Sequence, residues 1–332
     1  MSVGYANLDS HVKGLINGNY PDQGQVHYMV DSNFRTAAQG WSKADRTGPL
    51  DLYEARKAGS GGAQYVFRTG DYGTDTLAMQ AGVDALVDFR GDILFLTPGS
   101  YNPLTAVLLN ASSMRLLGPP VRKVRNSRST ITSTGGLTNT LDIPSGIDDV
   151  EIGFVQLIPV TTGNSIRAVA ADNLFIHNVF WNTTLPAVST GTQGIVFETT
   201  SSLYPEILDC EWLTIVGMGE AMEIGLTDNL YVARNRFISD ASTWANVVLT
   251  AATTLHAHFH ECYFGGRGAF TNVFTGVAGA DQLVVTDSYL DGTAAAFSAF
   301  ETGFDATTAI DIAEVYITGD ATGQGGVLGT LT

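Results

Sequence analysis

An eight-residue unit recurs seven times in the C-terminal two thirds of the chain, and it constrains the fold more than any other feature. Successive units begin 24, 31, 25, 27, 26 and 27 residues apart. Such even spacing predicts a solenoid in which each unit belongs to one coil. The units are VEIGFVQL at 150, LFIHNVFW at 174, PEILDCEW at 205, LYVARNRF at 230, AHFHECYF at 257, LVVTDSYL at 283 and IDIAEVYI at 310.

Four positions of the unit predict its inward side. Positions one, three and eight are almost always apolar, and position six always holds a residue of modest size. Because positions three and six differ in parity, a flat strand cannot point both inward, and the chain must turn near positions four and five. Coils of this kind stack as an all-β, single-stranded parallel β-helix. The residues at position six are Val155, Val179, Cys210, Asn235, Cys262, Ser288 and Val315.

Residues 70–102 predict the entry to this solenoid. Thr74 or Asp75 is placed to cap a helix that Gly91 ends, and residues 93–97 predict a strand stopped by Pro98-Gly99. The helix would cover the open end of the stack. Its apolar residues at near-helical spacing are Leu77, Ala81, Ala85 and Phe89.

This order of helix, Gly-Asp strand and Pro-Gly-x-Tyr turn resembles the pectate-lyase-like superfamily of right-handed parallel β-helices. Within it the chain looks most like bacteriophage tailspike and related virion proteins, because it lacks a secretion signal and carries a separate N-terminal segment. The resemblance covers roughly residues 70–320 and implies fold more strongly than activity. It implies a virion location after assembly in the host cytoplasm, a homotrimer, and other capsid or tail proteins as partners.

The N-terminal segment differs from the rest. Residues 1–65 are aromatic and polar without a clear period, so we expect an attachment arm followed by a β-helix domain over residues 66–332. The alternative is a tail that folds back on its own β-helix. The candidate attachment residues are Arg35, Trp41, Lys43, Arg46, Tyr53 and Arg56.

Charge is distributed unevenly. Residues 1–128 hold 13 of the 17 Lys and Arg and 11 of the 33 Asp and Glu, a net +2, which leaves 4 against 22, a net −18, for residues 129–332. Such an acidic part repels phosphate backbones, so we expect no nucleic-acid partner. No apolar run has the length of a membrane span, so membrane insertion is not expected either.

The unit AHFHECYF and the residue before it place His256, His258 and His260 on one face of a strand. A metal site would need a closing ligand and second-shell partners, and from the neighbouring coils only Asp287 approaches. We therefore expect surface or inter-subunit histidines, with no metal and no cofactor. Cys210 and Cys262 share the inward column two coils apart, about 9.6 Å by strand spacing, and should be free thiols.

Outward positions five and seven form charged columns. With coils about 4.8 Å apart, Arg234 would lie between Asp209 and Glu261, and Arg236 between Glu211 and Tyr263. One interpretation is a structural ladder of salt bridges and cation–π contacts. The other is a glycosidase pair drawn from four carboxylates, because adjacent or alternate coils suit retaining or inverting geometry. Those carboxylates are Asp209, Glu211, Glu261 and Asp287.

The outward aromatics Tyr263, Tyr289 and Tyr316 suit either sugar rings or a second subunit, and we favour the subunit. Lyase chemistry is less suited, because residues 129–332 offer four arginines and no lysine. The sequence therefore favours a structural virion protein, a capsid decoration or short spike. The alternatives are a depolymerase acting on host surface polysaccharide and a non-catalytic carbohydrate-binding solenoid.

Overall fold

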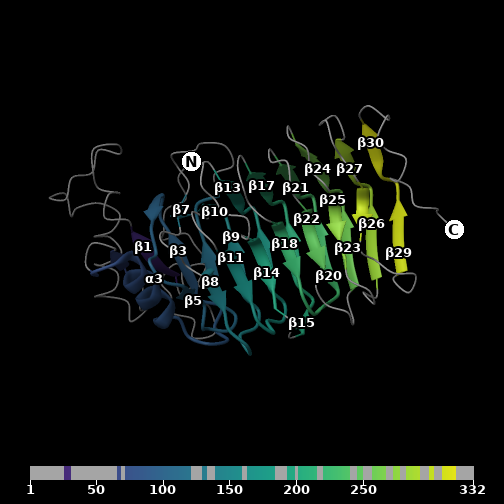
Figure 1. The fold of residues 1–332 in the computed structure, drawn as a ribbon. Helices are drawn as coiled ribbons and strands as arrows, with labels where there is room; N and C mark the ends of the chain where they lie inside the picture. The colour runs from purple at the N-terminus through teal and green to yellow at the C-terminus, as the bar shows by residue number, and fades with distance from the viewer. Residues whose placement is uncertain are drawn as a thin grey trace, which may run out of the picture.

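The chain folds as a parallel β-solenoid, seen in a computed structural model (Figure 1). Three sheets run along the axis of the molecule, and every strand pair in them is parallel, as the repeated unit predicts. A coil passes through a strand of each sheet in turn. The structure describes residues 26–30, 66–68, 72–120, 129–132, 139–158, 163–183, 193–198, 201–214, 220–239, 245–249, 256–266, 272–276, 282–291, 299–302 and 309–318.

Neighbouring strands within each sheet come mostly from successive coils. In order across the sheet, the first contains β2 (Val66–Arg68), β1 (Val26–Val30), β3 (Ile93–Leu96), β6 (Arg115–Leu117), β9 (Glu151–Gly153), β12 (Phe175–His177), β16 (Glu206–Leu208), β20 (Leu230–Ala233), β23 (His256–His260), β26 (Gln282–Thr286) and β29 (Ala309–Ala313). The second contains β30 (Tyr316–Thr318), β27 (Tyr289–Asp291), β24 (Tyr263–Gly266), β21 (Arg236–Ser239), β17 (Glu211–Thr214), β13 (Phe180–Thr183), β10 (Val155–Ile158), β7 (Ser129–Thr132) and β4 (Gly99–Tyr101). The third contains β28 (Ala299–Thr302), β25 (Asn272–Thr275), β22 (Ala245–Leu249), β18 (Glu220–Ile224), β14 (Gln193–Phe197), β11 (Asn164–Ala168), β8 (Asn139–Ile143) and β5 (Val107–Leu108), and β15 (Ser202–Leu203) pairs with β19 (Thr227–Asp228).

Each eight-residue unit forms one corner between the first and second sheets. The residue at position five has a left-handed backbone in all seven units, with φ between 50° and 58°. The corner predicted from the change of parity is therefore confirmed. None of these residues is glycine, although a left-handed residue with a side chain costs roughly 1–2 kcal/mol. They are Phe154, Asn178, Asp209, Arg234, Glu261, Asp287 and Glu314.

Behind the corner, like positions stack in the core. Position three pairs in register from coil to coil, as in Ile176 with Ile207, and both side chains are fully buried. Position eight carries the largest rings: Trp181 and Trp212 stack with centroids 4.4 Å apart and planes 1° from parallel, and Trp212 stacks on Phe237 at 4.5 Å. These contacts combine apolar burial with ring stacking along the axis.

Position six connects neighbouring coils through side chains. The buried Asn235 accepts a hydrogen bond from the backbone N–H of Cys210 at 2.6 Å and donates to the carbonyl of Ile207 at 2.7 Å. Ser288 accepts one from the N–H of Cys262 at 3.1 Å. Both cysteines are buried free thiols, as predicted, and burial raises the pKa of Cys262 to about 12.

The entry helix differs from the prediction. Helix α3 (Asp75–Asp84) starts at the predicted cap, because Thr74 Oγ1 accepts a hydrogen bond from the N–H of Leu77 at 3.2 Å, but it ends well before Gly91. The four apolar residues named from the sequence do not share one buried face: Ala81 and Ala85 pack against the core, whereas Leu77 is 57% exposed and Phe89, beyond the helix, is 75% exposed. α3 contacts β1 and β2, and the helix buries Thr76, Ala78, Met79, Gly82 and Val83.

The first sheet extends into the segment that the sequence assigns to the arm. β1 pairs with both β2 and β3, so residues 26–30 belong to the sheet. The division into residues 1–65 and 66–332 otherwise stays a prediction. Within the described ranges, no helix has the length and apolar character needed to span a bilayer. The candidate attachment residues lie outside the described residues: Arg35, Trp41, Lys43, Arg46, Tyr53 and Arg56.

The hydrogen bonds of Asn235 can be tested by Asn235→Val, which copies the valine that Val179 provides at the same position of another unit. Valine fits the space but leaves the N–H of Cys210 and the carbonyl of Ile207 without this partner in the core. We expect a loss of about 2–4 kcal/mol in the free energy of unfolding, measured by guanidinium denaturation. Ser288→Val removes one such acceptor and should cost less; equal midpoints for Asn235→Val and the unchanged protein would contradict the assignment.

Candidate functional site

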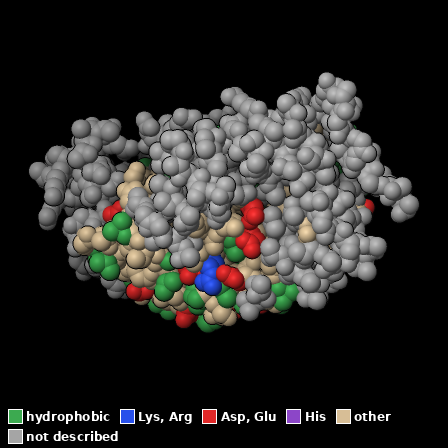
Figure 2. All heavy atoms as spheres, viewed as in Figure 1, with side chains coloured by type: hydrophobic (Ala, Val, Ile, Leu, Met, Phe, Trp, Pro, Cys, Tyr) green, Lys and Arg blue, Asp and Glu red, His purple; other side chains and the backbone are tan. Residues whose placement is uncertain are grey.

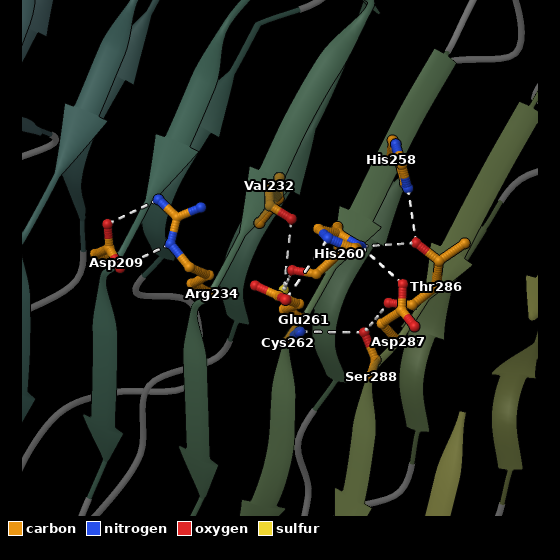
Figure 3. A network of polar contacts seen from close by, with 10 residues as sticks. All are labelled: Asp209, Val232, Arg234, His258, His260, Glu261, Cys262, Thr286, Asp287 and Ser288. Carbon is orange, nitrogen blue, oxygen red and sulfur yellow. Dashed lines mark hydrogen bonds and ion pairs between the residues drawn. The ribbon is translucent and has the colours of Figure 1, made fainter. Parts of the chain in front are cut away.

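The outward side of the corners between β16 and β26 carries a polar network (Figure 3). Arg234 binds Asp209 of the preceding coil in a bidentate pair, Nε to Oδ1 at 3.0 Å and Nη2 to Oδ2 at 2.9 Å. This hydrogen bonding raises the pKa of Arg234. One strand further, Arg236 Nη1 lies 3.6 Å from Glu211 Oε2, and its guanidinium lies 5.5 Å from the Tyr263 ring centroid. Arg234 therefore contacts Asp209, and Arg236 contacts Glu211 and Tyr263. The register of the units places these residues on the coils next to the arginines.

Two of the histidines meet at one hydroxyl. His258 Nε2 lies 2.9 Å and His260 Nδ1 3.0 Å from Thr286 Oγ1, and His260 Nδ1 is also 3.3 Å from Asp287 Oδ2. Partial burial and the neighbouring His260 lower the pKa of His258, while Asp287 opposes that shift. The third histidine is held elsewhere, because His256 Nδ1 contacts Asp228 Oδ1 at 2.7 Å.

Among the residues that the structure describes, no three or more His, Cys, Asp or Glu side chains are grouped so that they could hold a metal ion. The three histidines alternate along β23 with the buried Ala257 and Phe259, so their side chains lie on the outer face of the strand. The ring nitrogens instead contact Thr286, Asp287 and Asp228.

The four candidate catalytic carboxylates are spread along the corners. Asp209 and Glu211 are each paired with an arginine, whereas Glu261 and Asp287 both approach His260, at 3.9 Å and 3.3 Å. A hydrogen bond to Asp287 also raises the pKa of Glu314 on the next coil. A glycosidase needs two carboxyl groups facing one sugar. The described contacts instead join each of Asp209 and Glu211 to a cation on its neighbour.

A groove of about 340 Å³ lies beside this network on the outer face of the first sheet. Its lining includes Tyr231, His256, His258, Gln282 and Val284, and none of the four candidate carboxylates. The rings of Tyr231 and His258 meet edge to face, with centroids 5.5 Å apart. The groove thus combines aromatic surface with imidazole and amide groups, a composition suited to a neutral polar ligand.

The outward tyrosines form a column on the second sheet. Tyr263 and Tyr289 stack with centroids 5.5 Å apart and planes 9° from parallel, and Tyr289 pairs in register with Tyr316. The hydroxyl of Tyr263 donates to Asp291 Oδ2 at 3.0 Å, and burial together with this bond raises the pKa of Tyr263. Tyr316 is 63% exposed, so the column becomes more accessible toward its end.

Sequence reasoning missed a second charged group, on the third sheet. Arg167 Nε binds Glu198 Oε1 at 2.8 Å and its Nη1 binds Asp142 Oδ1 at 3.1 Å. Burial raises the pKa of Glu220, and burial followed by the charges of Glu220 and Glu198 raises the pKa of Glu223. Figure 2 shows a basic side chain, in blue, flanked by acidic side chains, in red, on the visible face. These residues lie between the eight-residue units, where no shared pattern marked the strands.

No protein-family model and no curated protein matches the sequence. Among solved structures, the chain is similar to ORF18 of Geobacillus virus E2, with 14% sequence identity and a TM-score of 0.38. The similarity covers 76% of this chain and 59% of that chain, so this chain spans less than two thirds of its length.

The raised pKa of Glu223 predicts a pH-dependent stability effect. Below the pKa of the unfolded state, both states are protonated. As pH rises above that value the unfolded state ionises first, while the folded state keeps its proton until its own raised pKa is reached, so stability falls between the two pKa values. Glu223→Gln should therefore leave the melting temperature unchanged near pH 4 and raise it near pH 7, measured by scanning calorimetry. The control Glu198→Gln removes the Arg167 pair and should not raise the melting temperature at neutral pH. If Glu223→Gln raises the melting temperature equally at both pH values, the raised pKa of Glu223 is refuted.

Proposed function

We propose that the chain is a structural protein of a bacteriophage virion, in which the solenoid projects outward and the N-terminal segment attaches it to the particle. The observation that carries this proposal is the continuous stack of parallel strands from β3 to β29, with the same side-chain positions paired from coil to coil. Each coil is held by its neighbours along the whole described length. Such a body suits a stiff part exposed on the outside of a particle.

Charge supports the same role. Residues 129–332 carry a net −18, which favours solubility and opposes adhesion to nucleic acid, whereas residues 1–128 carry a net +2 and suit docking on a protein. The entry helix, strand and turn resemble those of the pectate-lyase-like superfamily, and within it the separate N-terminal segment makes the chain look most like bacteriophage tailspike and related virion proteins. The partners are capsid or tail proteins, reached through the attachment residues of the N-terminal segment.

The proposed assembly is a homotrimer whose contacts include the tyrosine column. Tyr289 and Tyr316 present flat rings on the second sheet, and large amphipathic side chains of this kind are enriched in interfaces. A second subunit on this column would bury rings that one chain leaves partly exposed.

A second candidate function is non-catalytic binding of host surface polysaccharide. The groove at Tyr231 and His258 favours it, because an aromatic wall beside an amide and imidazoles suits a sugar ring. Catalysis has weaker support, since Asp209 and Glu211 are paired with arginines. A depolymerase would release reducing ends or unsaturated products from capsular polysaccharide. If the unchanged protein releases such products and the Glu261→Asn variant does not, the protein is an enzyme.

Attachment is tested by changing side chains rather than by removing residues 1–65, because β1 belongs to the first sheet. A variant with Arg35, Trp41, Lys43, Arg46, Tyr53 and Arg56 all changed to serine should fold, with unchanged circular dichroism and melting, and be missing from purified particles. The matched control changes Arg115, Tyr204 and Arg236, exposed basic and aromatic residues of the described solenoid, to serine and should still be incorporated. Wild-type incorporation of the first variant would contradict attachment through this segment.

The trimer is tested by sedimentation equilibrium. The proposal predicts a mass three times the 35.2 kDa of one chain. Changing Tyr289 and Tyr316 to serine should shift the equilibrium toward monomer by roughly tenfold or more, since interface rings carry much of the binding energy. Tyr204→Ser serves as the control; a monomeric parent protein would exclude the trimer.

A further inference from the structure

The exposed apolar side chains of the described solenoid are not distributed evenly. Apart from three tyrosines, every large hydrophobic side chain that the described residues leave exposed lies between residues 77 and 108. We call this set the cap patch. It consists of Leu77, Val87, Phe89, Leu104 and Leu108.

Hydrogen bonds show that the cap patch is assembled around α3. The backbone N–H of Leu104 donates to Thr76 Oγ1 at 2.7 Å, and the N–H of Leu108 donates to Gln80 Oε1 at 2.8 Å. The chain of residues 104–108 therefore runs beside the helix that carries Leu77. At the other end of α3, the N–H of Phe89 donates to the carbonyl of Ser112 at 3.0 Å. Figure 2 shows hydrophobic side chains at the end of the molecule where Figure 1 places α3.

Phe89 is the most exposed residue of the cap patch. Its backbone is left-handed, with φ 57°, and its ring is 75% exposed. The same left-handed conformation recurs at Ser113 and Asp149 on the following coils, with the same backbone hydrogen-bond pattern, so it belongs to the corners of the solenoid. Exposed apolar side chains gathered in one region mark an interaction site more often than an isolated exposed residue does.

We infer that the cap patch is the docking surface for residues 31–65 of the same chain. This segment leaves β1 after Val30 and returns at Val66 in β2, and α3 contacts both strands. Both ends of the 35-residue segment therefore join strands that contact α3, the helix that carries Leu77. Its root-mean-square span as a coil is about 30–35 Å, and α3, at ten residues, is about 15 Å long.

The composition of the segment matches the patch. It carries the apolar side chains Phe34, Leu50 and Leu52, and its basic residues can lie beside Asp84 and Asp88, which are exposed at the patch. Because the segment is tethered at both ends, its effective concentration at the patch is about millimolar, and even a weak intrinsic affinity suffices. Docking its apolar side would hold the basic attachment residues in an ordered layer at this end of the solenoid. The inference concerns the isolated chain and does not rest on the virion role.

Limited trypsin digestion of the full chain tests this docking, because the segment contains five cleavage residues. The changes Phe89→Asn and Leu108→Ser remove two patch side chains, and asparagine tolerates the left-handed backbone. Cleavage tracks the population of the undocked state, so we expect it to become roughly tenfold faster within residues 31–65, with unchanged melting of the solenoid. The trypsin sites are Arg35, Lys43, Arg46, Arg56 and Lys57.

The matched control is Tyr204→Asn. Tyr204 is also exposed and left-handed, with φ 56°, but it lies beside β15, far along the chain from the patch. It should leave cleavage within residues 31–65 unchanged. Equal cleavage rates in the parent and in the Phe89→Asn, Leu108→Ser variant would overturn the inference. Protection that grows with protein concentration would assign the patch to a second copy and would also overturn it.

A reciprocal measurement applies if the patch variant does not fold. In hydrogen exchange on the folded chain, changing Phe34, Leu50 and Leu52 to serine should increase deuterium uptake in residues 77–108. Uptake at β20 and β23 should stay the same. Unchanged uptake at the patch would refute docking by this segment, whether or not the protein is later found in particles.

Discussion

The solenoid depends on one backbone constraint, the left-handed residue at position five of each unit. This conformation turns the chain from the first sheet into the second within a single residue and brings positions three and six to the same side. Since seven corners share it, with φ between 50° and 58°, successive coils stay in register and like residues stack. The cost of each left-handed side chain is offset by the burial that the corner permits, as in the stacked rings of Trp181, Trp212 and Phe237.

The same register determines the chemistry of the surface. Any outward position becomes a column of side chains about 4.8 Å apart, so like charges in one column repel and opposite charges attract. Arg234 and Arg236 stand in columns that also hold Asp209 and Glu211 and pair with them. On the third sheet Arg167 does the same between Asp142 and Glu198, whereas Glu220 and Glu223 lack such a cation among the described contacts, and their pKa values are raised.

The two ends of the solenoid carry different surfaces. At the start, α3 and the cap patch present apolar surface beside a segment rich in aromatic and basic residues. Toward the other end, the tyrosine column and the groove at Tyr231 present aromatic surface on an acidic body. A protein attached by the first end would carry the second outward, where a neighbouring subunit or a glycan can reach it.

The sequence by itself determined the parallel stack, the corner and the inward columns, because a unit repeated seven times shows which positions must face the same environment. It also predicted which residues neighbour Arg234 and Arg236, since strand spacing and register are enough for that. Only the tertiary structure decided which side of α3 is buried: apolar residues occur on several sides of the helix, and the packing of β1 and β2 selects the side of Met79 and Val83 rather than that of Leu77. The raised pKa values of Glu220 and Glu223 were likewise beyond the sequence, because they arise from burial among third-sheet strands that share no visible pattern.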